Sequence, residues 1–256
     1  MRNLLAMAIA VTIAAAAHAA VTSSTQHGAT STSLDSQIAV GDIISGLIAT
    51  ELPGDLGWHP AVGDPLDKLP AFTDGAGIRG TGLTGLLNDN NPGVPVKLIQ
   101  YDLAQPTDIS HIRVLTGNNG KDGRVFSTFT VFASTDNGIN FNLLGYFQSD
   151  PSGTLNSDAS GHQWGSTLVT VFDDTNALLG SGVTNLQFNF YSVDNTGGQM
   201  RDPFGGVNPF TGIDDTLSAA FVSPLVFEID VLPEPATAFL LIGGLVLFSA
   251  SRRRSC

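Results

Sequence analysis

The sequence predicts an all-β protein, specifically an antiparallel jelly-roll β-sandwich, and three observations lead to this class. Apolar residues alternate with polar ones in at least six separate segments between residues 96 and 231. No helical pattern separates these segments, as it would in an α/β protein. Charged residues make up only 13% of the chain, while Gly, Asn, Ser and Thr are abundant, which favours strands joined by tight turns.

The expected strands follow one another with short polar connections. Asn137-Gly138 predicts a tight hairpin turn, because both residues tolerate positive φ angles. The strands are expected at residues 96–103, 109–116, 125–134, 141–144, 168–172, 186–193 and 223–231.

The segment before the sandwich, residues 20–69, is expected to be a lead with a short helix and loops. Val21–Ser33 has almost no apolar content, which is typical of a flexible segment. A short helix is expected to begin near Asp42, although Gly41 and Gly46 weaken it. The density of Gly, Pro and Asp from Pro53 onward predicts loops.

Charge and cysteine content exclude several classes of function. Residues 20–232 hold 7 Lys and Arg against 22 Asp and Glu, a difference of −15. Such a charge repels the phosphates of nucleic acid, so no nucleic-acid partner is expected. The single cysteine, Cys256, lies beyond the expected domain, which therefore has neither a disulfide nor a thiol nucleophile.

The first 19 residues have the parts of a secretory signal peptide. Arg2 supplies the positive start, Leu4–Ala17 is apolar, and Ala17-His18-Ala19 matches a small-x-small cleavage site for signal peptidase. The alternative is an uncleaved anchor.

The last segment, residues 232–256, predicts a single transmembrane helix. The apolar run Ala236–Ala250 follows Pro233, Glu234 and Pro235 and is stopped by Arg252, Arg253 and Arg254, the basic end expected to stay in the cytoplasm. Fifteen residues rise only ~22 Å as a helix, so the span is short for a bilayer. A buried core helix is the alternative reading.

This arrangement of Pro-Glu-Pro, apolar helix and arginine cluster resembles the PEP-CTERM sorting signal of Gram-negative bacteria. The resemblance implies that an exosortase-type membrane enzyme recognises the tail and cuts near Pro233–Pro235. The protein would then be exported, held transiently in the inner membrane by its tail, and delivered to the cell envelope or the extracellular space.

The middle of the chain resembles a discoidin-like, galactose-binding-type domain over residues 70–231. The resemblance rests on Ile112-Arg113-Val114 as a core strand, on the run Phe129–Phe141 as a strand, turn and return strand, and on Glu228–Val231 as the closing strand. The longer, Gly- and Pro-rich stretch 194–218 departs from the pattern. The resemblance implies the jelly-roll fold, and it implies little about function.

A calcium site is the first candidate. Jelly rolls of this type often hold one structural ion between a loop near the first strand and a Glu on the last, which places it here at Asp74 and Glu228. Ca²⁺ binds six to eight oxygen ligands, and Gly75 and Gly77 would let carbonyl groups turn inward. The alternative is that Asp74 only forms a turn and Glu228 faces solvent.

A glycan site is the second candidate, since Trp58, His162, Trp164 and Arg201 lie in Gly-rich segments and combine rings with polar groups. The alternative is a tryptophan folded over the edge of the core.

No catalytic motif is present: the chain has neither a His-x-x-x-His pair nor a Gly-x-Ser-x-Gly elbow. We therefore expect a non-enzymatic, structural or adhesive protein. A carbohydrate-binding module for an extracellular polysaccharide is the alternative, and a secreted hydrolase is a third reading.

Overall fold

The structure, a computed structural model, describes residues 20–89, 92–118, 123–150, 164–175, 177–193 and 200–234. The prediction of an all-β protein is confirmed, because helical structure in the described residues is limited to four short 3₁₀ turns. These turns are η1 (Asp35–Gln37), η2 (Pro65–Asp67), η3 (Leu69–Phe72) and η4 (Gly123–Val125). No helix among the described residues is long and apolar enough to cross a membrane. The expected signal peptide and transmembrane helix lie outside the described residues.

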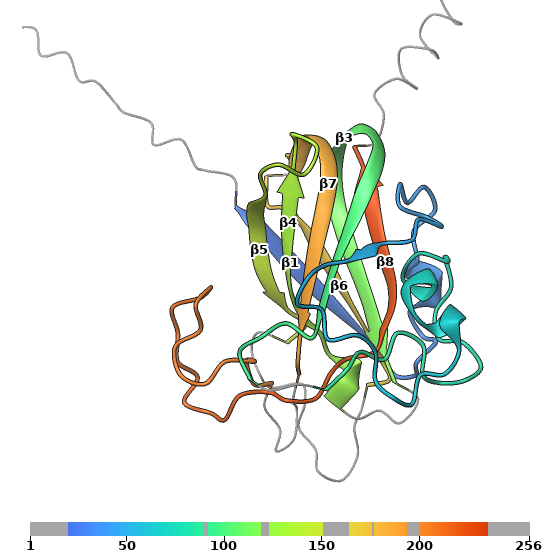
Figure 1. Cartoon of the computed structure of the whole chain (residues 1–256), viewed down its shortest axis with the longest axis vertical. Coiled ribbons are helices and arrows are strands. Elements are labelled where there is room, and N and C mark those ends of the chain that lie inside the picture. Colours follow the sequence, from blue (N-terminus) through green and yellow to red (C-terminus); the bar gives the residue numbers. More distant parts are fainter. Residues whose placement is uncertain are drawn as a thin grey trace, which may run out of the picture.

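In the described part of the chain, eight strands form one antiparallel sheet (Figure 1). They are β1 (Val21–Gly28), β2 (Thr50–Glu51), β3 (Lys97–Gly117), β4 (Thr128–Ser134), β5 (Asn142–Gln148), β6 (Ser166–Asp173), β7 (Gly180–Tyr191) and β8 (Val226–Pro233). The order along the sheet is β1-β6-β3-β7-β4-β5, and β2 and β8 also pair with β3.

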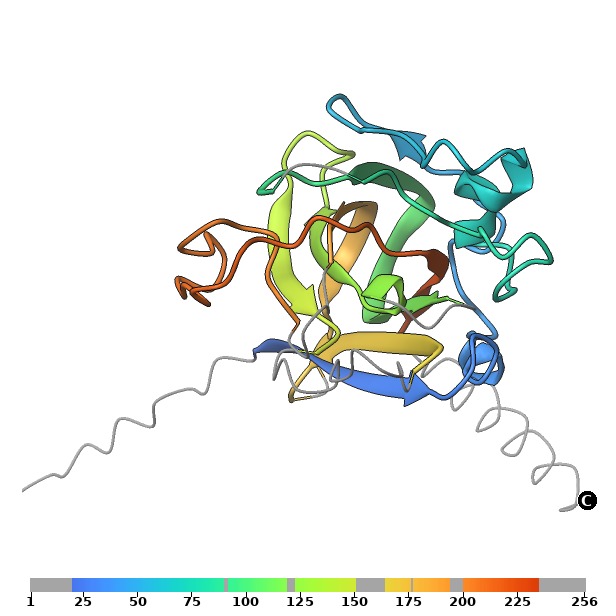
Figure 2. The same ribbon diagram turned by 90° about the horizontal axis from the view of Figure 1, so that it is seen from below.

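The long strand β3 turns this sheet into a sandwich. Its first half, around Lys97–Asp102, pairs with β7, whereas its second half, His111–Gly117, pairs with β6 and β8. The register shifts between Asp102 and Ile109, where the strand bends over at the top of the molecule (Figure 1). The sequence indicated two strands here, and the structure joins them into one. The two halves of the sheet therefore face each other and nearly close, so that the strands surround a common interior (Figure 2).

The alternation that predicted the strands fills this interior. Ile99, Val114, Val131 and Phe188 are fully buried in one cluster, to which every expected strand except 141–144 contributes a buried apolar residue. The expected hairpin turn is present, with φ of 59° at Asn137 and 79° at Gly138. Apolar burial on the inner face therefore decides which face of each strand points inward.

The lead before the sandwich differs from the expectation in two places. Val21–Gly28, expected to be flexible, forms β1 and pairs with β6 along its whole length. Backbone hydrogen bonds hold this strand, and its many Ser and Thr side chains gave no apolar alternation from which to predict it. The expected helix near Asp42 is also wrong, since residues 38–49 form turns and coil in which Gly41 and Gly46 have positive φ.

Candidate metal centre

The last strand, β8, pairs with β3 on one side, and the loop of residues 39–44 caps its other side. The Ile43 N–H donates to the Val231 carbonyl at 3.0 Å. The Val231 N–H donates to Asp42 Oδ1 at 2.7 Å, and the Ala39 N–H donates to Asp230 Oδ2 at 3.0 Å. This loop thus satisfies backbone groups that an uncovered edge strand would leave unpaired.

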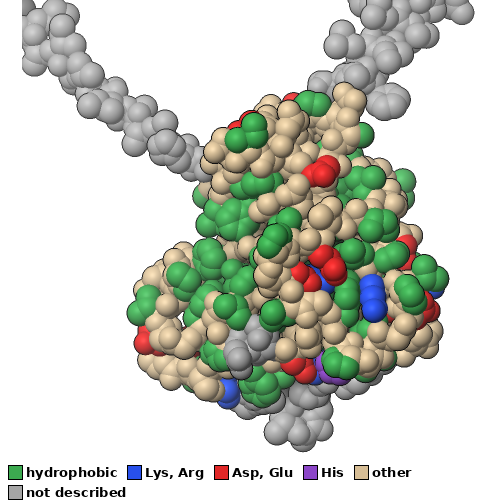
Figure 3. Space-filling model, in the orientation of Figure 1, with side chains coloured by type: hydrophobic (Ala, Val, Ile, Leu, Met, Phe, Trp, Pro, Cys, Tyr) green, Lys and Arg blue, Asp and Glu red, His purple; other side chains and the backbone are tan. Residues whose placement is uncertain are grey.

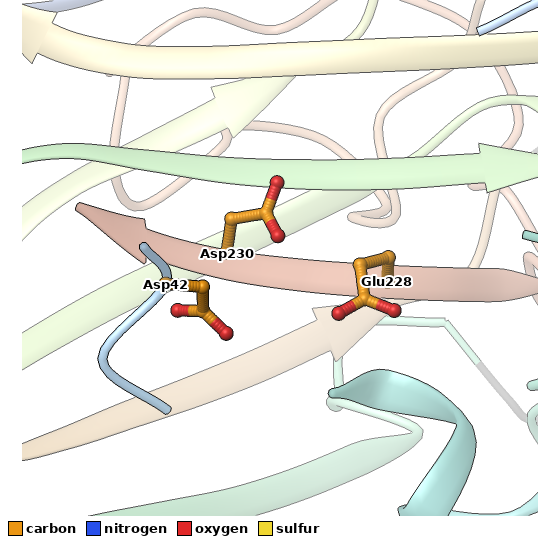
Figure 4. Close-up of side chains that lie close together, drawn as sticks. All are labelled: Asp42, Glu228 and Asp230. Carbon is orange, nitrogen blue, oxygen red and sulfur yellow. The ribbon is translucent and has the colours of Figure 1, made fainter. Parts of the chain in front are cut away.

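Three carboxylates meet at this capped edge, and we call them the β8 triad: Asp42 on the loop and Glu228 and Asp230 on β8 (Figure 4). One oxygen of each lies within 4.8 Å of the others. Glu228 and Asp230 share a face of the strand because they are two residues apart. Both are 2% exposed.

Each carboxylate of the triad accepts a hydrogen bond from the protein backbone through one of its oxygens. Asp42 Oδ1 accepts from Ile44 and Val231, Asp230 Oδ2 from Ala39, and Glu228 Oε2 from the Gly75 N–H at 3.1 Å. Asp42 Oδ2 and Asp230 Oδ1 are buried and have no hydrogen-bond partner. Buried polar atoms in native proteins are almost always paired, so these two oxygens are available to water or to a cation.

The electrostatics of the triad would also favour a cation. Burial, followed by the charges of Asp230, Asp74 and Asp42, raises the pKa of Glu228 to about 9. Burial, and then the charge of Asp42, raises the pKa of Asp230 to about 6. Burial likewise raises the pKa of Asp42. Without a cation, the triad must therefore take up protons near neutral pH to avoid mutual repulsion.

Tyr101 adds a fourth oxygen to this region. Its side chain is 1% exposed, and its hydroxyl has no hydrogen-bond partner among the described residues. Burial, and then the negative charges of Glu228 and Asp42, raise the pKa of Tyr101, so the phenol stays neutral beside the triad.

These donors fit a hard divalent cation. The triad supplies only oxygen, the ligand type that Ca²⁺ and Mg²⁺ prefer. Two oxygens bound to one Ca²⁺ at 2.3–2.6 Å lie at most about 5 Å apart, and the distances within the triad satisfy this limit. Zn²⁺ and Cu²⁺ would favour nitrogen or sulfur ligands, which the triad lacks.

The structure places the two predicted calcium ligands close together, but in different roles. Glu228 belongs to the triad. The loop of Asp74 reaches it through the Gly75 N–H, while the Asp74 carboxylate accepts from the Ala76 N–H at 2.9 Å and pairs with Arg79 at 3.5 Å. The sequence analysis did not identify Asp230 or Asp42. The Glu-x-Asp spacing on a strand could have indicated Asp230, whereas nothing local indicated Asp42.

The candidate glycan residues lie in separate surroundings. The Trp58 ring packs on Phe72 and carries the Lys97 ammonium 4.2 Å from its centroid, while its indole N–H donates to Glu51 at 2.9 Å. The Trp164 ring packs against His27, with centroids 5.4 Å apart, and its indole nitrogen is buried.

Arg201 donates to the Ser218 hydroxyl, and Phe204 and Phe210 pack with Tyr146 and Tyr191. His162 lies outside the described residues, as do Pro235, Arg252, Arg253 and Arg254 of the sorting signal. Pro233 and Glu234 continue the edge of β8, where the Glu234 N–H donates to the Asp108 carbonyl at 3.0 Å.

No protein-family model matches the chain, and no curated protein matches it significantly.

Proposed function

We propose that the chain is an exported, non-enzymatic protein of the cell envelope or extracellular matrix, whose sandwich is stabilised by calcium at the β8 triad. The observation that carries the proposal is the pair of buried, unpartnered oxygens on Asp42 and Asp230 beside Glu228. The proposed fold type is the discoidin-like jelly roll, for which a cation between an early loop and the last strand is expected.

Calcium suits a protein in this place. The domain has no cysteine with which to form disulfides, so an ion that joins Asp42 to the closing strand would replace a covalent link. Extracellular modules bind Ca²⁺ with dissociation constants of about 0.1–1 mM. A site of this affinity fills after export and stays largely empty in the cytoplasm.

Isothermal titration of the purified protein with CaCl₂ tests the site. We expect one saturable binding event, which Asp230→Asn weakens by at least about tenfold because one of three charged ligands is lost. Asp214→Asn is the matched control, since Asp214 is exposed and accepts a hydrogen bond within its own turn, from the Thr216 N–H. Absence of heat with millimolar calcium, or equal binding by Asp230→Asn, contradicts the proposal.

Export and sorting have a separate test. Mass spectrometry of the mature protein from a host with an exosortase-type enzyme should show an N-terminus near Ala20 and loss of Arg252–Arg254. Partners in this process are signal peptidase and the membrane enzyme. A mature chain that keeps the arginine cluster would refute the sorting proposal and leave the calcium proposal untouched.

A further inference from the structure

Lys97 occupies a position of β3 that the fold otherwise fills with apolar side chains. It shares one face of the strand with Ile99 and Tyr101, both of which lie in the core. Lys97 is itself 0% exposed, which is rare for a lysine. A buried ion pair often stabilises a fold no better than apolar residues of the same volume. The lysine at this position therefore calls for a chemical reason besides stability.

Two carboxylates contact the Lys97 side chain. Its Nζ donates to Glu51 Oε1 at 2.6 Å and to Asp55 Oδ1 at 2.9 Å. Glu51 lies on β2, which pairs with β3, and Asp55 lies in the turn that follows β2. The Asp55 side chain is 7% exposed. We call Glu51, Asp55 and Lys97 the lysine cluster, in which an amine and a carboxyl group touch in a place almost closed to water.

The backbone fixes the Asp55 carboxyl group through both of its oxygens. The Gly57 N–H donates to Oδ1 at 2.7 Å, and the Leu98 N–H donates to Oδ2 at 2.7 Å. N–H donors at this distance stabilise the negative charge that develops on a carboxyl oxygen when a nucleophile adds to its carbon. Asp55 is thus held in the manner of an acyl group prepared for attack.

Trp58 covers the lysine cluster and positions Glu51. Its ring lies 4.2 Å from Lys97 Nζ, and its indole N–H donates to Glu51 Oε1 at 2.9 Å. Glu51 is 40% exposed. The strand β2 crosses the front of the molecule in Figure 1, and acidic side chains gather near the middle of the same face in Figure 3. The cluster therefore has a covered interior and an outlet to solvent at Glu51.

We propose that Lys97 and Asp55 condense to an intramolecular amide, with Glu51 as the group that transfers protons. A first proton moves from Nζ to Oδ1 along their hydrogen bond and leaves a neutral amine beside a neutral carboxylic acid. The Nζ lone pair then attacks Cγ of Asp55, and a C–N bond forms while negative charge collects on Oδ2 beside the Leu98 N–H.

Release of water completes the reaction. Glu51 takes a second proton from Nζ and passes it to Oδ1, the Cγ–Oδ1 bond breaks, and Oδ1 leaves as water. The ammonium and the carboxylate thus become one amide and one water molecule, and Glu51 is returned unchanged. The structure shows the three groups before reaction, as an unlinked ion pair.

The reaction needs only the chain itself. Two groups held in contact react as if one were present at about 10⁵–10⁸ M, when their geometry is productive. The amide would join the segment before the sandwich to β3 in a domain that has no cysteine for a disulfide. Where it forms, the loss of stability in any Lys97 variant includes the loss of this link. The inference is independent of the proposed export and of the β8 triad.

Intact-mass spectrometry of the purified full chain tests the amide. We expect a mass below that of the sequence by one water molecule, equally with calcium and with a chelator. Trypsin does not cut after an acylated lysine, so digestion should give one branched peptide that joins the peptide ending at Lys68 to residues 80–113. A protein of full sequence mass, with separate peptides 80–97 and 98–113, would overturn the proposal without any variant.

Variants locate the reaction. Lys97→Arg keeps the positive charge but has no amine that can condense, so the full mass should return. Lys68→Arg is the matched control and should still lose water. A water loss that persists in Lys97→Arg, such as a succinimide at an Asp-Gly pair, would overturn the proposal.

Glu51→Gln tests the proton transfer. It should slow the appearance of the linked mass after cell-free synthesis by about 100-fold or more. A circular dichroism spectrum like that of the parent shows that the fold is kept, which the partial exposure of Glu51 favours. A variant that links at the parental rate would overturn the role of Glu51.

Discussion

Replacing Glu228 with Gln should change how the stability of the protein depends on pH. The folded-state pKa of Glu228 is about 9, above its ordinary value of 4.5, so folding without a cation takes up a proton. The stability from this proton is complete below about pH 4.5 and is lost as the pH rises towards 9. Glu228→Gln removes the charge, so its stability should vary far less over this range.

The magnitude follows from the linkage between protons and folding. One proton taken up on folding costs about 1.4 kcal/mol of stability per pH unit, or about 4 kcal/mol between pH 5 and pH 8. This is an upper bound, because relaxation and water penetration reduce the penalty of a buried charge. A free calcium concentration of 100 times the dissociation constant should raise the free energy of unfolding by about 2.7 kcal/mol. In a domain of this size, this raises the melting temperature by roughly 5–10 °C.

Thermal unfolding at pH 5 and pH 8, with calcium or with a chelator, measures both effects. The parent should lose stability from pH 5 to pH 8 in the chelator and regain it with calcium. Glu228→Gln should show a much smaller response to pH and to calcium, the remainder coming from Asp42 and Asp230, whereas Asp214→Asn should behave as the parent does. A parent protein whose melting temperature is the same in all four conditions would refute the reasoning about the triad.

Two further substitutions test the packing of the sandwich outside the triad. Lys97→Met should cost about 3–5 kcal/mol in denaturant unfolding, because the fully buried ammonium pairs with Glu51 at 2.6 Å and with Asp55 at 2.9 Å. Its loss leaves the buried Asp55 carboxylate with backbone N–H donors but no ion-pair partner. An effect no larger than that of Lys68→Met would contradict this. Gly85→Ala should cost more than about 2 kcal/mol in the same assay, because Gly85 has φ of 63° and the added methyl group would overlap the Val226 backbone. Gly63→Ala is the control: a methyl group there meets no atom, so the substitution should be nearly neutral.

The sequence predicted those parts of the fold that depend on apolar burial. Phe129, Val131 and Phe188 alternate with polar neighbours, and all three lie in the core. The same reasoning failed for β1, whose Ser- and Thr-rich strand is held by backbone pairing with β6. The same reasoning predicted two strands in place of β3, because Gln105-Pro106 is typical of a break between strands. In the structure these two residues lie in the bend of one continuous strand.

The candidate site was predictable only in its β8 part. Glu228 stood out on the closing strand, and Asp230 follows it on the same face. Asp42 is 189 residues from Val231, to which it is hydrogen-bonded, and it lies in a segment whose apolar residues favoured a helix. A contact between distant segments leaves no periodic signal in either of them, so only the folded arrangement could bring the third carboxylate to the triad.

The capped edge links the cation site to the proposed processing site. The N–H of Val231 donates to Asp42, and its carbonyl accepts from Ile43, both in the loop 39–44. Pro233 and Glu234 are still paired along β3. A protease needs an extended, accessible segment, so cutting at Pro233–Pro235 requires the end of β8 to leave the sheet. Contacts that hold Asp42 and Asp230 together would oppose this opening. If calcium fills the triad after export, as proposed above, it would make the last strand harder to release, and the position of the cut would move towards the residues that follow Glu234.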